Sequence, residues 1–374
     1  MTDAPDSPDT SDAPDAPDAP DSPDAPAAAD PQDTTAALPG LDLARLRERL
    51  DRDLPGLLDG PLRARLFEGG KSNLTYLLTD GTGRWVLRRP PLGHVLATAH
   101  DMAREFRVLG ALHPTAVPVP EPLLLIEDAE VIGAPCYLMQ YAPGAVFRDE
   151  EQFAGLGPER VHGLGLHLVD TLVALHALDP AAVGLGDFGR PEGFLERQLG
   201  RWGKQLAASR SREVAGIDEL QAHLAATLPP SPAPALVHGD YRLDNVLVDG
   251  DDRITAVLDW EMSTVGDPLT DLGLLVMYVE LARRFDGVLP GAVLAPGFPA
   301  TGELVARYAA GSGRDVSALG WYVGFASFKL AVVLEGIHYR WTKGGTVGPG
   351  FDRVGELVPA FVEFGLAALK LKEH

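Results

Sequence analysis

The sequence predicts a two-lobed α+β protein, in which a small lobe containing a β-sheet (residues 41–142) precedes a larger, mostly helical lobe (residues 143–374). Strand-like and helix-like runs alternate in the first region, whereas apolar residues at helical spacing dominate the second. The chain has 374 residues, of which 45% are hydrophobic, and is therefore large enough to bury the core of two lobes. Residues 1–40 differ in composition and predict a disordered acidic tail.

The predicted tail is a low-complexity segment in which Asp recurs every third position from Asp3 to Asp24. It holds ten of the 53 acidic residues and nine of the 32 prolines, and it has neither Lys nor Arg. After Met1, no apolar side chain larger than Ala occurs until Leu38. Burial therefore cannot offset the entropy of ordering the segment. A spacer or solubility tail fits this composition best, and an interaction tail is the alternative.

The small lobe is expected to alternate helices with two hairpins. Asp80-Gly81 joins two strand-like runs and is a typical hairpin signal, here with a longer turn. The first predicted helix ends at Pro55, because proline cannot continue a helix. The expected elements are a helix over 41–54, strands over 73–80 and 83–90, a helix over 100–113, and strands over 119–128 and 134–144.

The large lobe is expected to be helical, with short strands only around its central motif. Its predicted helices show apolar residues at i, i+3 and i+4. The expected helices lie over 163–178, 193–208, 267–284 and 355–372, and the expected strands lie within 235–240, 245–249 and 253–260.

Composition argues against several classes of protein. The single cysteine, Cys136, rules out a disulfide framework and a cysteine-built zinc site. A net charge of −21 argues against a nucleic-acid partner. No apolar run approaches the roughly 20 residues of a spanning helix, and no basic region precedes an apolar stretch at the N-terminus. We therefore expect a cytoplasmic protein with no membrane partner. The large lobe carries 30 acidic against 20 basic residues, which indicates either attraction of a cationic ligand or an ordinary solvated surface.

The strongest motif lies over residues 236–249, where His238, Gly239 and Asp240 are followed five positions later by Asn245. A strand follows, and then Asp259. This order places two carboxylates and an amide at two adjacent strand ends and the loop between them. Phosphoryl transfer needs such a set: one carboxylate accepts the proton of the acceptor hydroxyl, and an amide with a second carboxylate holds Mg²⁺. Asp and Asn caps of a simple turn are the alternative.

These motifs resemble those of the aminoglycoside and choline kinase-like phosphotransferase family, whose fold is related to that of the protein kinases. His-Gly-Asp and the Asp-Trp pair at 259–260 are marks of this small-molecule branch. The resemblance covers about residues 41–374 and implies a bilobal protein-kinase-like fold. It also implies that Asp240 is the catalytic base, that Asn245 and Asp259 are Mg²⁺ ligands, and that Arg242 lies near the transferred phosphate.

The resemblance places a phosphate-covering loop over residues 67–78. Gly69 and Gly70 permit close approach of the backbone, and the amides of Ser72 and Asn73 are expected to face phosphate oxygens. A plain glycine-containing hairpin is the alternative. Gly-Lys-Ser at 70–72 is not a Walker A ending, because that motif requires glycine where Arg65 stands.

Two further segments complete the expected nucleotide site. Val86 and Arg88 should share one face of their strand. The resemblance to kinases places an adenine-contacting residue on that face, and it implies this role for Val86. Arg88 then takes the position of the kinase lysine, with Glu105 as its partner from the helix. The family has Lys at this position, so Arg88 departs from its pattern. Arg89 is the second candidate for the same role. The alternative is a surface strand whose arginines are exposed. In the linker between the lobes, the Gln140 carbonyl and the Ala142 amide are expected to pair with the base.

Residues 193–202 and 327–341 resemble the branch whose kinase-like domains are fused to acyl-CoA dehydrogenases, which would imply hydroxyacyl-type acceptors. Helix packing explains these segments equally well. Asp267 and Asp271 are expected to brace the metal loop, and His176 is expected to be a core residue. The pocket candidates are Arg197, Trp202, Lys329, Glu335 and Arg340.

The sequence therefore predicts an ATP- or GTP-dependent, Mg²⁺-assisted phosphotransferase that acts on the hydroxyl of a small molecule. A protein Ser/Thr kinase is less favoured, because only seven residues separate Asp259 from Asp267 and leave no room for a long activation segment. A non-catalytic nucleotide-binding module is the other alternative. The sequence leaves open the acceptor, the choice between ATP and GTP, and the oligomeric state.

Overall fold

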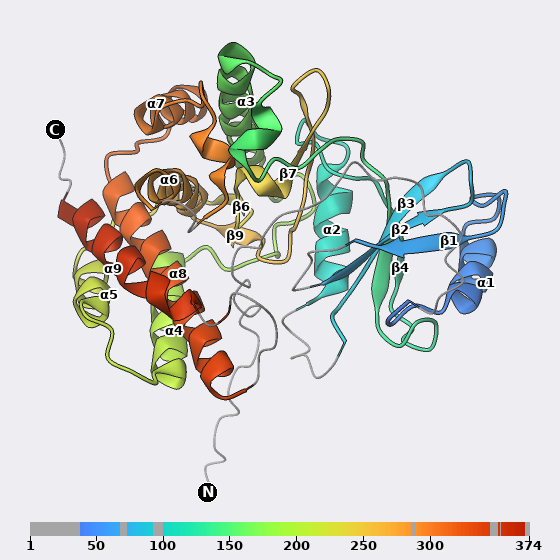
Figure 1. The fold of residues 1–374 in the computed structure, drawn as a ribbon, viewed down its shortest axis with the longest axis horizontal. Helices are drawn as coiled ribbons and strands as arrows, with labels where there is room; N and C mark the ends of the chain where they lie inside the picture. The colour runs from blue at the N-terminus through green and yellow to red at the C-terminus, as the bar shows by residue number, and fades with distance from the viewer. Residues whose placement is uncertain are drawn as a thin grey trace, which may run out of the picture.

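The computed structural model describes residues 38–67, 73–92, 100–285, 289–344, 351 and 353–370. Within these residues the chain forms a small lobe with a β-sheet and a large helical lobe, so the expected two-lobed α+β fold is confirmed (Figure 1). The predicted tail over residues 1–40 lies almost entirely outside the described residues and stays a prediction, as does the boundary at residue 142.

The small lobe is built on a five-stranded antiparallel sheet with strand order β1-β2-β3-β5-β4. Figure 1 shows α1 at the outer end of this sheet and α2 between the sheet and the large lobe. The elements are α1 (Leu43–Asp53), β1 (Arg63–Leu66), β2 (Leu74–Thr79), β3 (Arg84–Arg89), α2 (Met102–Leu112), β4 (Pro122–Ile126) and β5 (Cys136–Gln140).

Alternation along β3 decides which side chains reach the space between the lobes. Trp85 and Leu87 belong to the core that the sheet shares with α1. Val86 lies on the opposite face, in the core that includes α2 and the large lobe. Because successive side chains of a strand point to opposite faces, Arg88 shares the face of Val86, as expected from the sequence.

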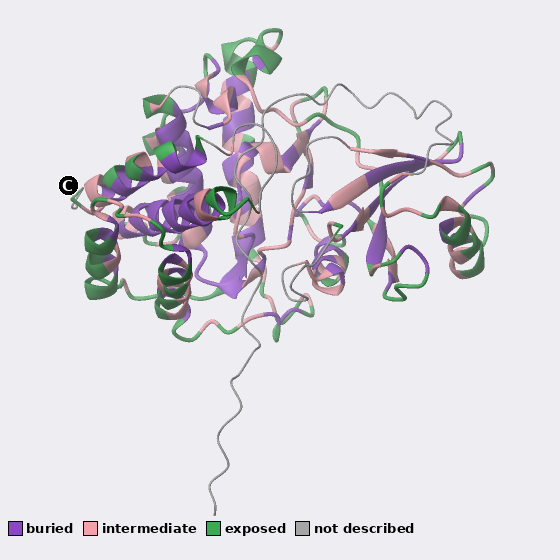
Figure 2. Ribbon diagram, turned by 60° about the horizontal axis from the view of Figure 1, so that its bottom comes forward, coloured by how far each residue is buried: buried purple, intermediate pink, exposed green. Residues whose placement is uncertain are grey.

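The large lobe packs its helices around α8, which is buried from Trp321 to Ile337. Figure 2 shows buried residues along the helices of this lobe, with exposed residues on their outer sides. Helix α8 is long and apolar enough to cross a membrane, but its apolar stretch is buried within the described residues, as in the core helix of a globular fold. The elements are η1 (Glu150–Phe153), α3 (Pro158–Ala177), α4 (Phe194–Ser209), α5 (Ile217–Ala226), β6 (Ala235–Val237), η2 (Leu243–Asn245), β7 (Val246–Val248), β8 (Ile254–Val257), β9 (Thr264–Gly266), α6 (Leu269–Arg284), η3 (Gly291–Leu294), α7 (Thr301–Ser312), α8 (Leu319–Thr342) and α9 (Val354–Lys370).

The structure corrects several details of the expected arrangement. The strands β6 and β8, expected side by side, lie in separate two-stranded sheets, because β6 pairs with β9 and β7 pairs with β8. The sequence reading also missed β1, β9, α5 and α7, which are short or weakly patterned. Helix α6 begins at Leu269, two residues after the start of the expected range, and its first amide donates to Asp267 Oδ1 at 3.0 Å.

Candidate active site

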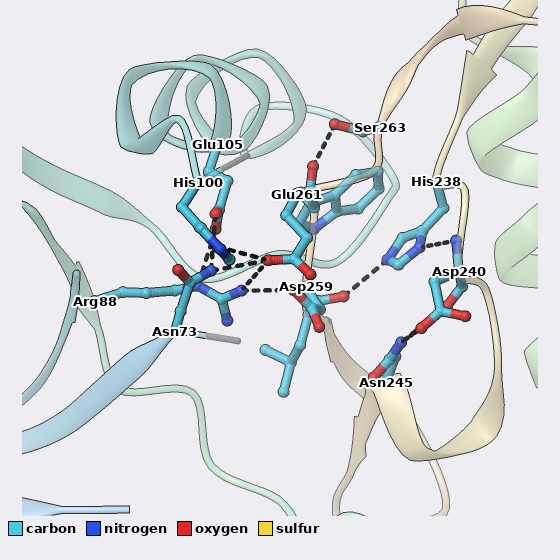
Figure 3. A network of polar contacts seen from close by, with 12 residues as sticks. Asn73, Arg88, His100, Glu105, His238, Asp240, Asn245, Asp259, Glu261 and Ser263 are labelled. Atoms are coloured by element: carbon cyan, nitrogen blue, oxygen red, sulfur yellow. Dashed lines mark hydrogen bonds and ion pairs between the residues drawn. The ribbon is translucent and has the colours of Figure 1, made fainter. Parts of the chain in front are cut away.

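The loop between β6 and β7 brings Asp240 and Asn245 into direct contact. Asn245 Nδ2 donates to Asp240 Oδ2 at 3.0 Å and to the Asp240 carbonyl at 2.8 Å. The Tyr278 hydroxyl donates to Asp240 Oδ1 at 3.4 Å from α6. The Asp240 carboxylate is therefore held on both oxygens. Figure 3 shows the contact between Asn245 and Asp240, which closes the turn between these residues.

Asp271 anchors the start of this loop from the first turn of α6. Its carboxylate accepts from the His238 amide at 2.7 Å and from the Gly239 amide at 2.8 Å, and His176 Nε2 donates to it at 3.2 Å. Burial alone would raise the pKa of Asp271, but the hydrogen bonds from His176 and His238 bring it below its ordinary value. Asp271 thus braces the loop before Asp240 rather than the metal loop, which corrects the sequence-based expectation.

Gly239 occupies a position that only glycine fits. Its φ is 86°, and a Cβ atom there would lie 2.6 Å from the Met262 carbonyl. Left-handed backbone conformations cost non-glycine residues free energy. The Gly in the His-Gly-Asp motif therefore lets the loop pass close to the chain that follows Asp259.

Asp259 is tied to the same loop through the backbone. The Leu258 amide donates to the Asn245 carbonyl at 2.8 Å, and His238 Nε2 donates to the Leu258 carbonyl at 2.8 Å. Asp259 itself has a φ of 64°, a conformation that few non-glycine residues adopt. Figure 3 shows its carboxylate between Arg88 and Asn245, so Asp240, Asn245 and Asp259 lie close together.

Arg88 joins the two lobes by ion pairs. Its Nη2 lies 2.5 Å from Asp259 Oδ1, and its Nε lies 3.0 Å from Glu105 Oε2 on α2. Glu105 is 2% exposed and also accepts from the Tyr137 hydroxyl at 2.9 Å. Burial raises the pKa of Glu105 to about 7, although Arg88 opposes this. The pairing expected between Arg88 and Glu105 is present, and Arg89 instead donates to the Gly40 carbonyl at 2.6 Å.

We predict that Glu105 makes stability depend on pH. Its pKa is about 7 in the folded protein against an ordinary 4.5, so between these values the folded state binds more protons than the unfolded state. Stability should therefore fall as pH rises through this window, by about 3 kcal/mol at ~1.4 kcal/mol per pKa unit. Glu105→Gln should remove this slope in urea unfolding at pH 4.5 to 8, whereas Glu48→Gln on exposed α1 should keep it. Identical slopes in wild type and Glu105→Gln would contradict the assignment.

Glu261, which the sequence reading missed, extends this cluster. Asn73 Nδ2 donates to Glu261 Oε2 at 2.9 Å and to Glu105 Oε1 at 3.4 Å. His100 Nδ1 and Arg88 Nη2 each lie 3.8 Å from Glu261 Oε2. The only signal in the sequence was an acidic residue two positions after Asp259. Asn73 is buried, and its Oδ1 has no hydrogen-bond partner among the described residues.

Arg242 packs beside Asp240 without a close hydrogen bond to it. Its Nε lies 3.9 Å from Asp240 Oδ2, and its guanidinium lies 4.9 Å from the centre of the Tyr278 ring. It forms a short ion pair with Asp244, whose pKa burial raises above its ordinary value. Tyr278, like Glu261, is a site residue that no sequence motif predicted, because it lies on α6, more than 30 positions after Asp240.

The remaining predicted nucleotide contacts are only partly described. Gly69, Gly70 and Ser72 lie outside the described residues. Gln140 is exposed at the end of β5, and the Ala142 amide has no backbone partner among the residues that the structure describes. An unpaired amide in the linker fits the expected contact with a base.

The donor set at residues 245 and 259 fits Mg²⁺. Within the described ranges, no three His, Cys, Asp or Glu side chains form a metal-binding group of their own. Mg²⁺ commonly takes one or two protein oxygens and completes its shell with phosphates and water. Because Asn245 turns its amide nitrogen to Asp240, its oxygen is directed elsewhere, and Asp259 supplies a carboxylate on the adjoining segment.

A cavity of about 420 Å³ reaches the loop between β6 and β7, the proposed catalytic loop, at Gly239 rather than at Asp240. Five basic and three acidic side chains line it, with the aromatic rings of Phe188, Phe194, Trp202 and Phe325. The charged lining residues are Arg104, Arg190, Arg197, Arg201, Lys329, Asp101, Asp187 and Asp271.

The cavity separates the pocket candidates into two groups. Arg197, Trp202 and Lys329 line it, but Glu335 and Arg340 do not. Glu335 is buried and pairs with Arg212 at 2.8 Å, so its role is in helix packing. Glu335 thus matches the alternative of helix packing, and the role of Arg340 stays a prediction.

Comparisons with known proteins agree with this geometry. The model of the phosphotransferase enzyme family matches residues 63–319. Acyl-CoA dehydrogenase family member 11 of Rattus norvegicus is 34% identical over 346 residues, which are 90% of this chain and 44% of that protein. Family member 10 of Mus musculus is 32% identical, over 89% of this chain and 31% of that protein. The chain thus spans less than half the length of these curated relatives.

Solved structures give the same fold. A Ralstonia eutropha protein described as an aminoglycoside phosphotransferase is 31% identical, with a TM-score of 0.78 over 89% of this chain and 99% of its own. The aminoglycoside phosphotransferase APH(4)-Ia, in a ternary complex with AMP-PNP and hygromycin B, has a TM-score of 0.57 at 18% identity, over 86% of this chain and 98% of its own. The second likeness concerns the fold alone.

Proposed function

The chain belongs to the phosphotransferase enzyme family, and from that premise we propose that it transfers the γ-phosphoryl group of ATP, or of GTP, to a hydroxyl of a small molecule with the help of Mg²⁺. The observation that carries the proposal is the meeting of Asp240, Asn245 and Asp259 at the junction of the lobes, where Arg88 pairs with Asp259 at 2.5 Å. A fold neighbour that binds AMP-PNP and hygromycin B supports a nucleotide and a hydroxyl-bearing acceptor.

In this proposal Asp240 is the base. The acceptor oxygen forms a bond to the γ-phosphorus as the bridge to the β-phosphate breaks, and the hydroxyl proton passes to the Asp240 carboxylate. The contacts from Asn245 and Tyr278 fix that carboxylate before the reaction. Positioning of the reacting groups, together with charge neutralisation, accounts for most of the rate acceleration in phosphoryl transfer.

The other charged groups bind and neutralise phosphates. Asn245 and Asp259 would hold Mg²⁺, which supplies positive charge to the phosphate oxygens when it is bound. Arg88 would contact the phosphates from β3 while Glu105 keeps it in place. Arg242, next to Asp240, would face the transferred phosphoryl group. Val86, Gln140 and Ala142 would surround the adenine or guanine ring of the nucleotide.

We further propose that the acceptor carries an anionic group, as a hydroxyacyl compound does. The large lobe as a whole is acidic, but the cavity at Gly239 has more basic than acidic side chains. A cationic aminoglycoside would meet repulsion there. The kinship with acyl-CoA dehydrogenase family members 10 and 11 agrees with an acyl-type acceptor, although the match covers less than half of each of them.

A nucleotide-consumption screen tests the function. Purified protein with Mg²⁺ and ATP or GTP should consume nucleotide in the presence of hydroxy acids or hydroxyacyl-CoAs more than with aminoglycosides, macrolides or amino alcohols. Asp240→Asn serves as the matched negative control. Tight binding of Mg·ATP with no transfer to any of these acceptors would instead favour a non-catalytic nucleotide-binding module.

A further inference from the structure

Lys329 reaches the catalytic loop from the buried helix α8. Its Nζ donates to the Gly239 carbonyl at 2.8 Å, and the residue is 8% exposed. That carbonyl belongs to the peptide group that ends at the Asp240 nitrogen. The contact therefore acts directly on the backbone that carries the proposed base.

Gly239 is held on both of its backbone groups by charged side chains. Asp271 on α6 accepts from its amide at 2.8 Å, and Lys329 on α8 donates to its carbonyl. The two helices thus fix the peptide planes on either side of a glycine whose φ is 86°. A glycine held in this way cannot use its conformational freedom, so the direction of the Asp240 side chain toward Asn245 is set.

The stability of the fold does not account for a lysine at this place. A buried ammonium group loses its hydration, and this loss is costly without a compensating partner. Among the described residues Lys329 has no ion pair within 4.0 Å; the centre of the Trp202 ring lies 5.7 Å from Nζ, and the carboxylates of Asp240 and Asp271 only partly offset the cost of burial from a greater distance. Burial accordingly lowers the pKa of Lys329. An apolar side chain of similar length would pack on α8 without this cost.

We propose that Lys329 is a positioning residue for phosphoryl transfer, which holds the Gly239–Asp240 peptide so that the Asp240 carboxylate faces the acceptor. This inference rests on the proposed function, because it assigns Asp240 the role of base. It adds a residue of α8 to the site, from a part of the sequence nearly 90 positions after the catalytic loop.

The neighbouring cavity makes the inference testable by chemical rescue. Lys329 and Gly239 both line it, so a small amine that enters the cavity can reach the space that a shortened side chain leaves. Lys329→Ala should lower kcat by about 10- to 100-fold, the loss expected for one hydrogen bond from a charged group. The Kd of Mg·ATP should change less than twofold. Propylammonium should restore much of kcat, whereas 1-propanol should not. Lys204→Met, on the exposed face of α4, should behave as wild type.

Amide hydrogen exchange gives a second readout that needs no turnover. Lys329→Met should speed exchange over residues 238–241 and leave the amides in the centre of α8 protected. Unchanged exchange there, or equal losses in kcat and nucleotide affinity without amine rescue, would overturn the positioning role. If wild type shows no transfer at all, the proposed function fails, and the exchange result still decides whether Lys329 orders the loop.

Discussion

Asp240→Asn is expected to lower turnover by about 10²–10⁴-fold, the usual contribution of a general base, while the protein still folds and binds Mg·ATP. Asn keeps the shape of Asp and can still accept the hydrogen bond from Asn245 Nδ2, which now spans 3.0 Å. It cannot take up the acceptor proton. The measurement is steady-state turnover with the best acceptor from the screen, together with a calorimetric titration of Mg·ATP.

The matched control for this variant is Asp251→Asn, which changes an exposed carboxylate near the β7–β8 turn. It should leave turnover and nucleotide affinity as in wild type. Turnover of Asp240→Asn within about threefold of wild type would remove Asp240 from the role of base, because positioning alone would then account for the rate.

Asp259→Asn is expected to abolish most of the Mg²⁺ dependence of nucleotide binding. The variant replaces the only carboxylate of the proposed metal site with a neutral amide, so Mg·ATP should bind at least about tenfold more weakly, which equals ~1.4 kcal/mol. Asn is preferable to Ala here because Asp259 has a φ of 64°, and Asn tolerates that conformation. The measurement is ATP affinity with and without Mg²⁺.

The chain offers a close control for this test. Asp252 also has a positive φ, of 60°, and it pairs with Arg160 at 2.6 Å, away from the junction of the lobes. Asp252→Asn should therefore lose some stability but keep the Mg²⁺ dependence. If Asp259→Asn retains the full Mg²⁺ effect, the metal assignment at residue 259 is wrong.

The sequence predicted the parts of the site that depend on short-range order. A spacing of five positions from Asp240 to Asn245 is enough to close a turn, and alternation along one strand places Arg88 on the same face as Val86. The fold class followed from periodicity in the same way. Glycine at 239 could be read as part of a motif, but its close approach to the Met262 carbonyl could not.

Contacts between distant segments could not be read from the sequence. Glu261 reaches Asn73 across 188 positions, and Lys329 reaches Gly239 across 90. Neither residue type nor spacing encodes such pairs, because they depend on how the lobes and helices pack. Average charge was also misleading: the large lobe is acidic, yet the cavity beside its catalytic loop is lined by five basic side chains against three acidic ones.

The most direct test of the account is a crystal structure of the protein with Mg²⁺ and a non-hydrolysable ATP analogue. We predict a metal ion bound by the Asn245 oxygen and the Asp259 carboxylate, with the γ-phosphate between that ion and Asp240 and with Arg88 turned toward the phosphates. A nucleotide bound elsewhere, or a metal ion that touches neither Asn245 nor Asp259, would contradict this prediction.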